Sequence, residues 1–162
     1  MDKPDPTLGD GSTPERVPVA RALFEEYEES LGIDLCFQGF DRELAELPGA
    51  YAPPAGRLLL ALVDGEAAGC VALRPLDGGD CELKRLYVRP AHRSLGLGRL
   101  LTRTIVGIAA ELGYSRILLD TLPSMTEAQT LYRSLGFRPT DAYTVNPVPG
   151  ATFMALELER RA

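Results

Sequence analysis

Residues 88–99 read Val-Arg-Pro-Ala-His-Arg-Ser-Leu-Gly-Leu-Gly-Arg, and this stretch decides the fold of the chain. An apolar-rich strand pattern at residues 81–88 precedes it, and an amphipathic helix pattern at residues 99–112 follows it. The first amides of a helix have no partner within the helix, and the helix dipole favours negative charge beside them. Gly96 and Gly98 let a phosphate approach the backbone closely. The stretch therefore predicts a binding site for a phosphorylated cofactor.

The spacing of the glycines distinguishes this turn from two other phosphate-binding loops. A dinucleotide fingerprint requires Gly-x-Gly-x-x-Gly, but its third glycine position falls on Leu101. A P-loop requires Gly-Lys followed by Ser or Thr, and that tripeptide does not occur in the chain. The pattern that remains is Arg93-x-x-Gly96-x-Gly98. Taken alone, it is also compatible with a plain turn between a strand and a helix.

A second pattern follows the next predicted strand. Ser124 and Glu127 have the spacing of a capping box, which predicts a helix that begins after Ser124. Gly136 is placed to end this helix. One face of the helix is formed by Ala128, Leu131, Tyr132 and Leu135. With the Arg-x-x-Gly-x-Gly loop before it, Ala-x-x-Leu-Tyr-x-x-x-Gly-Phe at 128–137 resembles the second signature of the GNAT superfamily of N-acetyltransferases.

The resemblance covers residues 13–158 and implies an α/β fold, a GNAT-like mixed and mostly antiparallel sheet flanked by helices in an α/β/α sandwich. We expect a flexible N-terminal tail at residues 1–12 and a single GNAT-like domain at 13–162. The family's first strand would then be missing, or rebuilt from a segment such as Thr7-Leu8. Further helices are expected from Thr13-Pro14 to residue 31 and at 40–47. Strands are expected at 58–63, 69–74, 116–121, 137–145 and 152–158, the first two joined by a turn at Asp64-Gly65.

Composition limits the class of protein. A chain of 162 residues with 45% hydrophobic residues can bury one domain's core. The net charge of −6 argues against a nucleic-acid partner, and no apolar run is long enough to span a membrane. The polar N-terminus lacks a signal-peptide core. Cys36, Cys70 and Cys81 show no metal or redox spacing, which favours reduced thiols in a cytoplasmic protein and predicts no metal site.

The resemblance also implies which residues hold acetyl-CoA. The loop amides would bind the pyrophosphate of coenzyme A, and the end of the preceding strand would pair with the pantetheine arm. The expected cofactor-binding residues are Leu86, Tyr87, Val88, Arg93, Ser94, Leu95, Gly96, Leu97, Gly98, Arg99 and Ala128. Two positions depart from the family pattern, because Met125 stands where an asparagine is common and Ser94 stands where a glycine is common.

Acetyl transfer by direct attack in a ternary complex requires a base, an oxyanion donor and an acid. In the family pattern these fall on Glu82, on the amide of Val88 and on Tyr132. Each side chain also has a structural interpretation: Glu82 as a strand carboxylate paired with a neighbouring cation, and Tyr132 as a core aromatic.

Residues for the acceptor are less well defined by the sequence. Lys84 and Arg85 lie in the strand of Glu82, and strand alternation predicts that only Lys84 shares its face. Tyr51, Tyr143 and Asn146 occupy loops where relatives build acceptor pockets, and His92 is expected at the surface. We expect a small-molecule or amino-acid amine as the acceptor. A protein amine acceptor and a non-catalytic acyl-CoA-binding module are alternatives, and the resemblance allows a homodimer.

Overall fold

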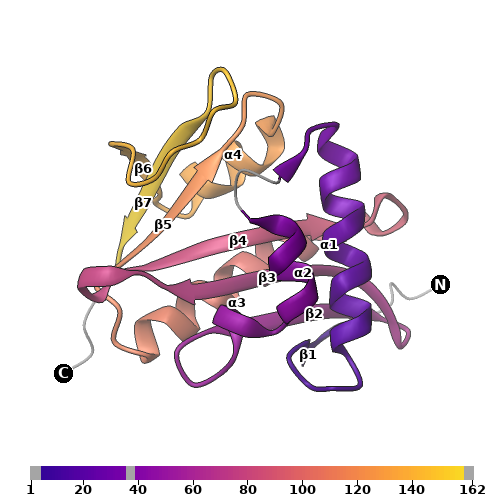
Figure 1. Cartoon of the computed structure of the whole chain (residues 1–162). Helices are drawn as coiled ribbons and strands as arrows, with labels where there is room; N and C mark the ends of the chain where they lie inside the picture. The colour runs from indigo at the N-terminus through magenta and orange to yellow at the C-terminus, as the bar shows by residue number, and fades with distance from the viewer. Residues whose placement is uncertain (1–4, 36–38, 159–162) are drawn as a thin grey trace.

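A computed structural model describes residues 5–35 and 39–158, which form one seven-stranded sheet (Figure 1). The spatial order is β1-β2-β3-β4-β5-β7-β6, and every neighbouring pair is antiparallel except β4 and β5. The strands are β1 (Pro6–Asp10), β2 (Arg57–Val63), β3 (Glu66–Pro75), β4 (Cys81–Val88), β5 (Arg116–Thr121), β6 (Arg138–Thr140) and β7 (Thr152–Glu157). The predicted mixed, mostly antiparallel sheet is confirmed.

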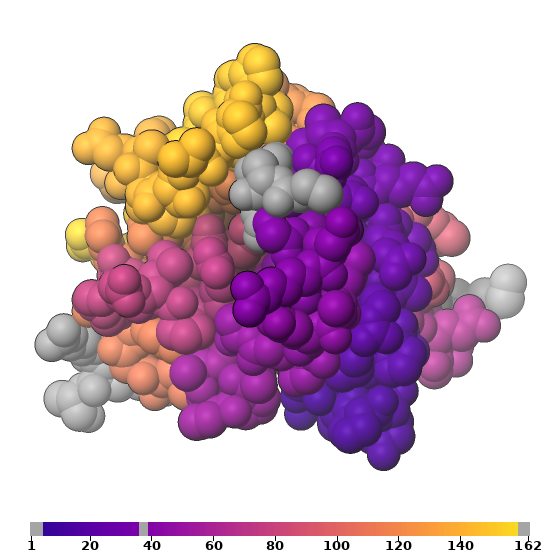
Figure 2. All heavy atoms as spheres, viewed as in Figure 1, coloured from indigo at the N-terminus to yellow at the C-terminus, as the bar shows by residue number. Residues whose placement is uncertain are grey.

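Helices cover both faces of the sheet, as predicted for an α/β/α sandwich. In Figure 1, α1 and α2 lie in front of the sheet and α3 lies behind it. Figure 2 shows the front face, where α1 and α2 form one continuous surface beside the C-terminal hairpin. The α-helices are α1 (Val17–Leu31), α2 (Phe40–Glu46), α3 (Leu97–Glu111) and α4 (Thr126–Ser134). Short 3₁₀ helices are η2 (Gly49–Tyr51), η3 (Asp77–Gly79) and η4 (Pro90–His92).

Because side chains alternate between the two faces along each strand, the sheet has one hydrophobic core on each face. In β2, Leu58 and Leu60 pack with α1, whereas Leu59 and Ala61 pack with α3. The turn that joins β2 to β3 is Asp64-Gly65, and both residues have positive φ, as a two-residue type I′ hairpin turn requires. The sequence pattern predicted this hairpin.

Several predicted boundaries are wrong. Residues 6–10 are not part of a flexible tail but form β1, which pairs with β2, so Thr7-Leu8 does rebuild the family's first strand. Backbone pairing with an edge strand suffices there despite the polar sequence. The capping box is not formed, because α4 begins at Thr126 with Met125 as its N-cap and no side-chain cap.

Other predicted boundaries differ from the observed ones by a few residues. The helix predicted from Thr13-Pro14 begins at Val17, and the helix predicted at residues 99–112 begins at Leu97. The strand predicted at residues 137–145 is only Arg138–Thr140, because Asp141 and the residues after it leave the sheet. Cys70 and Cys81 are buried free thiols, whereas Cys36 lies outside the described residues.

The strand β4 contains a bulge at Arg85, where its pairing with β3 is interrupted. Between the pairs Cys70–Tyr87 and Ala72–Lys84, β3 contributes one residue and β4 contributes two. Arg85 lies in this bulge and has a φ of +61°, a left-handed conformation that side chains rarely adopt. On its other side, β4 pairs with β5 only at Cys81 and Glu82. Beyond Glu82 the two strands diverge, as Figure 1 shows, and the edge of β4 is open.

Candidate active site

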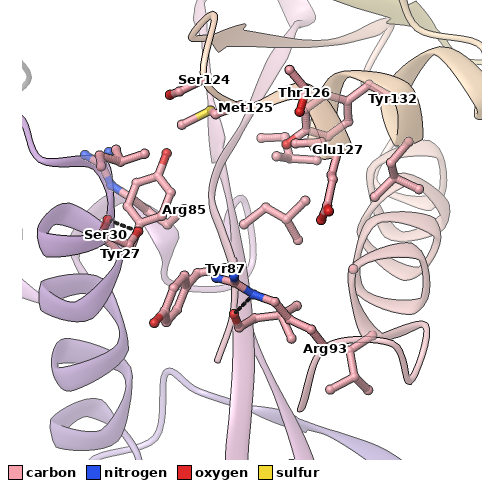
Figure 3. Close-up of a pocket in the computed structure, with 18 of the residues that line it drawn as sticks. Tyr27, Ser30, Arg85, Tyr87, Arg93, Ser124, Met125, Thr126, Glu127 and Tyr132 are labelled. Atoms are coloured by element: carbon pink, nitrogen blue, oxygen red, sulfur yellow. Dashed lines mark hydrogen bonds between the residues drawn. The ribbon is translucent and has the colours of Figure 1, made fainter. Parts of the chain in front are cut away.

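A cavity of about 630 Å³ lies where β4 and β5 diverge (Figure 3). Its walls come from α1, the second half of β4, the loop before α3, the end of β5 and the beginning of α4. Tyr27 of α1 therefore lines the same cavity as Tyr132 of α4, although these helices cover opposite faces of the sheet. The cavity thus passes between the strands and connects the two faces.

The loop before α3 offers a row of backbone donors to this cavity. The amides of Ser94, Leu95 and Gly96, and the first three amides of α3 (97–99), make no hydrogen bond within the described residues. Ser94 and Gly96 both have a φ of +76°, which turns successive N–H groups outward into an anion-binding concavity. The dipole of α3 favours negative charge at the same place. These residues fit a pyrophosphate group.

Most of the predicted cofactor residues line the cavity. They are Leu86, Tyr87, Val88, Arg93, Ser94, Gly96, Leu97, Gly98 and Ala128. Leu95 and Arg99 do not line it, because Leu95 packs against the core and Arg99 donates to Ser134 Oγ at 3.0 Å. The Nε of Arg93 donates to the carbonyl of Val88 at 3.2 Å and so fixes the end of β4 against the loop (Figure 3).

Tyr132 lines the cavity from α4 and is 5% exposed. Its ring centroid lies 5.5 Å from that of Phe137, which packs the ring into the core. Its hydroxyl makes no hydrogen bond within residues 5–35 and 39–158. Burial raises the pKa of this hydroxyl well above its ordinary value. Tyr132 is therefore a buried, protonated donor at the cavity wall.

Glu82 does not line this cavity. Its side chain is 1% exposed, and its carboxylate accepts hydrogen bonds from Arg74 Nε at 2.7 Å and from the Tyr143 hydroxyl at 2.5 Å. Lys84 Nζ lies 4.0 Å from the same carboxylate. Burial, together with the Glu82 carboxylate, raises the pKa of the Tyr143 hydroxyl. Glu82 therefore holds the loop after β6 against the sheet through Tyr143.

The expectation that only Lys84 shares the face of Glu82 is wrong, because the bulge breaks strand alternation at Arg85. Arg85 turns toward α1 and α2, where its guanidinium pairs with Glu43 and lies 4.9 Å from the Phe40 ring centroid. Lys84 and Arg85 both line the cavity. Burial lowers the pKa of the Lys84 ammonium, although Glu82 opposes that shift.

The other predicted acceptor residues, Tyr51, Tyr143 and Asn146, do not line the cavity. The hydroxyl of Tyr51 donates to Glu43 Oε1 at 2.9 Å, and burial raises its pKa. Asn146 Nδ2 donates to Asp120 Oδ2 at 2.9 Å. Through Tyr143 and Asn146, the loop between β6 and β7 is anchored to β4 and to β5.

Sequence reasoning missed several residues of the cavity wall. Asp120 lies at the end of β5 and lines the cavity, as do Thr126 and Glu127 at the beginning of α4. Asp120 is the penultimate residue of an apolar strand next to the predicted cofactor loop, and that position was the available signal. His92, expected at the surface, is partly buried and is among the residues that line the cavity.

Comparison with known proteins agrees with this geometry. Residues 20–137 match the model of the acetyltransferase (GNAT) family. The chain is 46% identical over 142 residues to an uncharacterized N-acetyltransferase of Schizosaccharomyces pombe, a match that covers 86% of this chain and 87% of the relative. It is 30% identical to one of Dictyostelium discoideum, covering 90% of this chain and 96% of that relative.

Solved structures share the fold. An acetyltransferase of the GNAT family from Staphylococcus aureus superposes with a TM-score of 0.79 at 20% identity, covering 96% of this chain and 100% of that one. The chain therefore belongs to the GNAT acetyltransferase family and is an acyltransferase. This family uses acetyl-CoA. Among the described helices, we find none with the length and apolarity needed to cross a membrane.

Proposed function

We propose that the protein transfers the acetyl group of acetyl-CoA to a primary amine of a small molecule or amino acid, by direct attack in a ternary complex. The observation that carries this proposal is the row of unpaired amides from Ser94 to residue 99, in which Ser94, Gly96, Leu97 and Gly98 line the same cavity as Tyr132. A structure of yncA from Salmonella typhimurium with acetyl-CoA supports it at the level of the fold (TM-score 0.69, 23% identity, covering 98% of this chain and 96% of that one).

In this proposal, the loop before α3 and the strand β4 bind different parts of acetyl-CoA. The loop amides, with Arg93 beside them, would hold the pyrophosphate of the cofactor. The open edge of β4 from Leu86 to Val88 would pair with the pantetheine arm in the manner of a strand. The amide of Val88 would then donate to the thioester oxygen, where negative charge develops as the amine attacks. Acetyl-CoA supplies the activated acetyl group.

Tyr132 would protonate the leaving sulfur. A thiol has a pKa of about 8.5 and a phenol of about 10, so proton transfer to a thiolate is only slightly uphill for an ordinary tyrosine. Burial raises the pKa of Tyr132, which keeps its hydroxyl protonated before the reaction but makes transfer of the proton less favourable. A thiolate in the same buried cavity is also desolvated, which raises the pKa of its thiol and opposes this effect. The proton leaves as negative charge builds on the sulfur, and an unpaired hydroxyl at the cavity wall suits this role.

We propose Glu82 and Asp120 as the candidates for taking the proton from the amine, although Glu127 of α4 lines the cavity as well. Glu82 is the residue that the family pattern suggests, and it would act through a water or through its neighbours because it lies outside the cavity wall. Asp120 lines the cavity directly, from the C-terminal end of β5. Direct access favours Asp120, because a general base must come within hydrogen-bond reach of the proton it removes.

The compartment is also part of the proposal. Cys70 and Cys81 are free thiols, as is typical of the reducing cytoplasm, and we propose a cytoplasmic enzyme.

The experiment is thiol release from acetyl-CoA with a panel of amino acids, polyamines, aminoglycosides and peptide N-termini. Tyr132→Phe serves as the matched control, since it removes one hydroxyl and keeps the packing. We expect acceptor-dependent thiol release that is much slower in the variant. Equal release by both proteins would exclude Tyr132 as the acid. Release with peptide N-termini alone would replace the small-molecule acceptor with a protein acceptor.

A further inference from the structure

Tyr27 of α1 lines the cavity from the face of the sheet opposite to Tyr132. Two contacts hold its ring: the ring of Tyr87 meets it edge-on with the centroids 6.2 Å apart, and the Arg85 guanidinium lies 6.0 Å from its centroid. In Figure 3, Tyr27 lies on one side of β4 and Tyr132 lies on the other. The position of the Tyr27 hydroxyl is therefore set by the packing of its ring.

The hydroxyl of Tyr27 makes no hydrogen bond within residues 5–35 and 39–158. Among these residues, the one buried side-chain nitrogen or oxygen without a hydrogen bond is Nδ1 of His92, so the Tyr27 oxygen is not sealed off but open to a ligand. Desolvation by the surrounding side chains raises the pKa of Tyr27 to about 12, although the charge of Arg85 opposes the rise. The hydroxyl is therefore protonated at neutral pH and can donate or accept a hydrogen bond.

The carboxylate of Asp120 lies near the hydroxyls of both tyrosines. Burial is the main cause of the raised pKa of Tyr27 and of Tyr132, and the negative charge of Asp120 adds to the rise in both. The three side chains thus meet at the same part of the cavity. In the proposed function, Tyr132 faces the leaving sulfur and Asp120 takes the proton from the amine. An amine that attacks from the side away from the sulfur would meet Tyr27 beside Asp120.

We propose that the hydroxyl of Tyr27 binds the attacking nitrogen of the acceptor amine. This inference rests on the proposed function and adds an acceptor-binding residue to it. A neutral primary amine has one lone pair and two N–H groups. While the lone pair attacks the thioester carbon, one N–H would donate to the Asp120 carboxylate and the other to the Tyr27 oxygen. Tyr27 would thus orient the lone pair toward the acetyl group.

Two conjugates of coenzyme A test this contact without knowledge of the natural acceptor. In the amide conjugate, a methylene-carbonyl unit joins the sulfur to the nitrogen of ethylamine, which places an N–H in the acceptor part of the cavity. In the ketone conjugate, a methylene group replaces that N–H. Tyr27→Phe removes one hydroxyl and keeps the ring. Tyr114→Phe is the matched control, because the Tyr114 hydroxyl donates to the Ala55 carbonyl at 2.6 Å and Tyr114 does not line the cavity.

Titration calorimetry of coenzyme A and of both conjugates into the full chain and these variants provides the readout. We expect Tyr27→Phe to raise the Kd of the amide conjugate about 10-fold, as for loss of one hydrogen bond, and to leave the other two Kd values within about 2-fold of the parent. Tyr114→Phe should change none of the three. The difference between the conjugates isolates the contact with the nitrogen, as in a double-mutant cycle.

An unchanged Kd of the amide conjugate in Tyr27→Phe would overturn the proposal. An equal rise for the amide and ketone conjugates would also overturn it, because such a rise marks a purely structural role of the hydroxyl. With normal binding of coenzyme A, either result leaves the proposed function intact. Failure of the parent protein to bind coenzyme A would instead overturn the proposed function itself.

Discussion

Arg85 of β4 and Glu43 of α2 form a two-point ion pair, in which Arg85 Nε lies 2.9 Å from Glu43 Oε2 and Nη2 lies 3.0 Å from Oε1. The Arg85 side chain is 2% exposed and that of Glu43 is 18% exposed. The pair joins the bulge of β4 to the helix that covers it, and Tyr51 donates to the same carboxylate. The bulge, whose residue Arg85 lines the cavity, is thus held by side chains from a distant segment.

Glu43→Ala should therefore lower the free energy of unfolding by about 3 kcal/mol, because it removes the carboxylate that forms the two-point ion pair with the buried Arg85 guanidinium. Urea unfolding measures this loss. Glu46→Ala is the matched control in the same helix, since Glu46 pairs with Arg42 and both side chains are exposed (58% and 82%). That variant should lose no more than about 0.5 kcal/mol. Equal losses would show that the buried pair does not stabilise the bulge.

Ser94→Gly should raise the free energy of unfolding by about 0.5 kcal/mol, because Ser94 has a φ of +76° that glycine adopts without strain. Part of the relief is lost to the greater freedom of glycine in the unfolded chain. Ser94→Ala keeps the Cβ and should show no gain. Thermal unfolding compares the two variants, and a glycine variant less stable than the alanine variant would refute the strain argument.

Tyr132→Phe should lower kcat about 100-fold and leave the Kd for acetyl-CoA unchanged, because the hydroxyl contributes only as an acid. Since burial raises its pKa, this hydroxyl stays protonated as pH rises, and wild-type kcat should not fall between about pH 8 and pH 10 through Tyr132 ionisation. Tyr114→Phe is the control, as the Tyr114 hydroxyl donates to the Ala55 carbonyl at 2.6 Å, away from the cavity. A matching kcat loss in both variants would contradict the assignment.

Asp120→Asn and Glu82→Gln separate the two candidate bases. If Asp120 takes the proton, Asp120→Asn should lower kcat about 100-fold. Glu82→Gln should mainly lower the melting temperature, because a neutral amide no longer offsets the positive charges of the buried Lys84 ammonium and of the Arg74 guanidinium, which both pair with Glu82. Steady-state kinetics and thermal unfolding of each variant provide both readouts. A larger kcat loss in Glu82→Gln would return the role of base to Glu82.

Local patterns predicted the parts of the fold that depend on neighbouring residues. The hairpin turn at Asp64-Gly65, the end of α3 before Gly113 and the loop at Arg93-x-x-Gly96-x-Gly98 each rest on a backbone requirement visible in a few residues. The strand β1 was not identified as such, because its hydrogen bonds come from β2, about fifty residues later, rather than from its own apolar pattern.

The candidate site was predictable to a smaller extent, for a physical reason. The contact that turns Arg85 toward α2 depends on the bulge, and no period-two pattern in residues 81–88 reveals a bulge. Asp120 and Tyr27 reach the cavity only because β4 and β5 diverge, which is a property of sheet pairing. Glycine spacing, in contrast, marked the phosphate loop directly.

The most direct test of the account is titration calorimetry of acetyl-CoA into the purified full chain. We expect one binding site per chain with a Kd in about the micromolar range, equivalent to about −8 kcal/mol. Such binding would support the assignment of the amides from Ser94 to residue 99 as the site of the cofactor phosphates. Absence of binding heat up to about 1 mM acetyl-CoA, in protein shown to be folded, would contradict it.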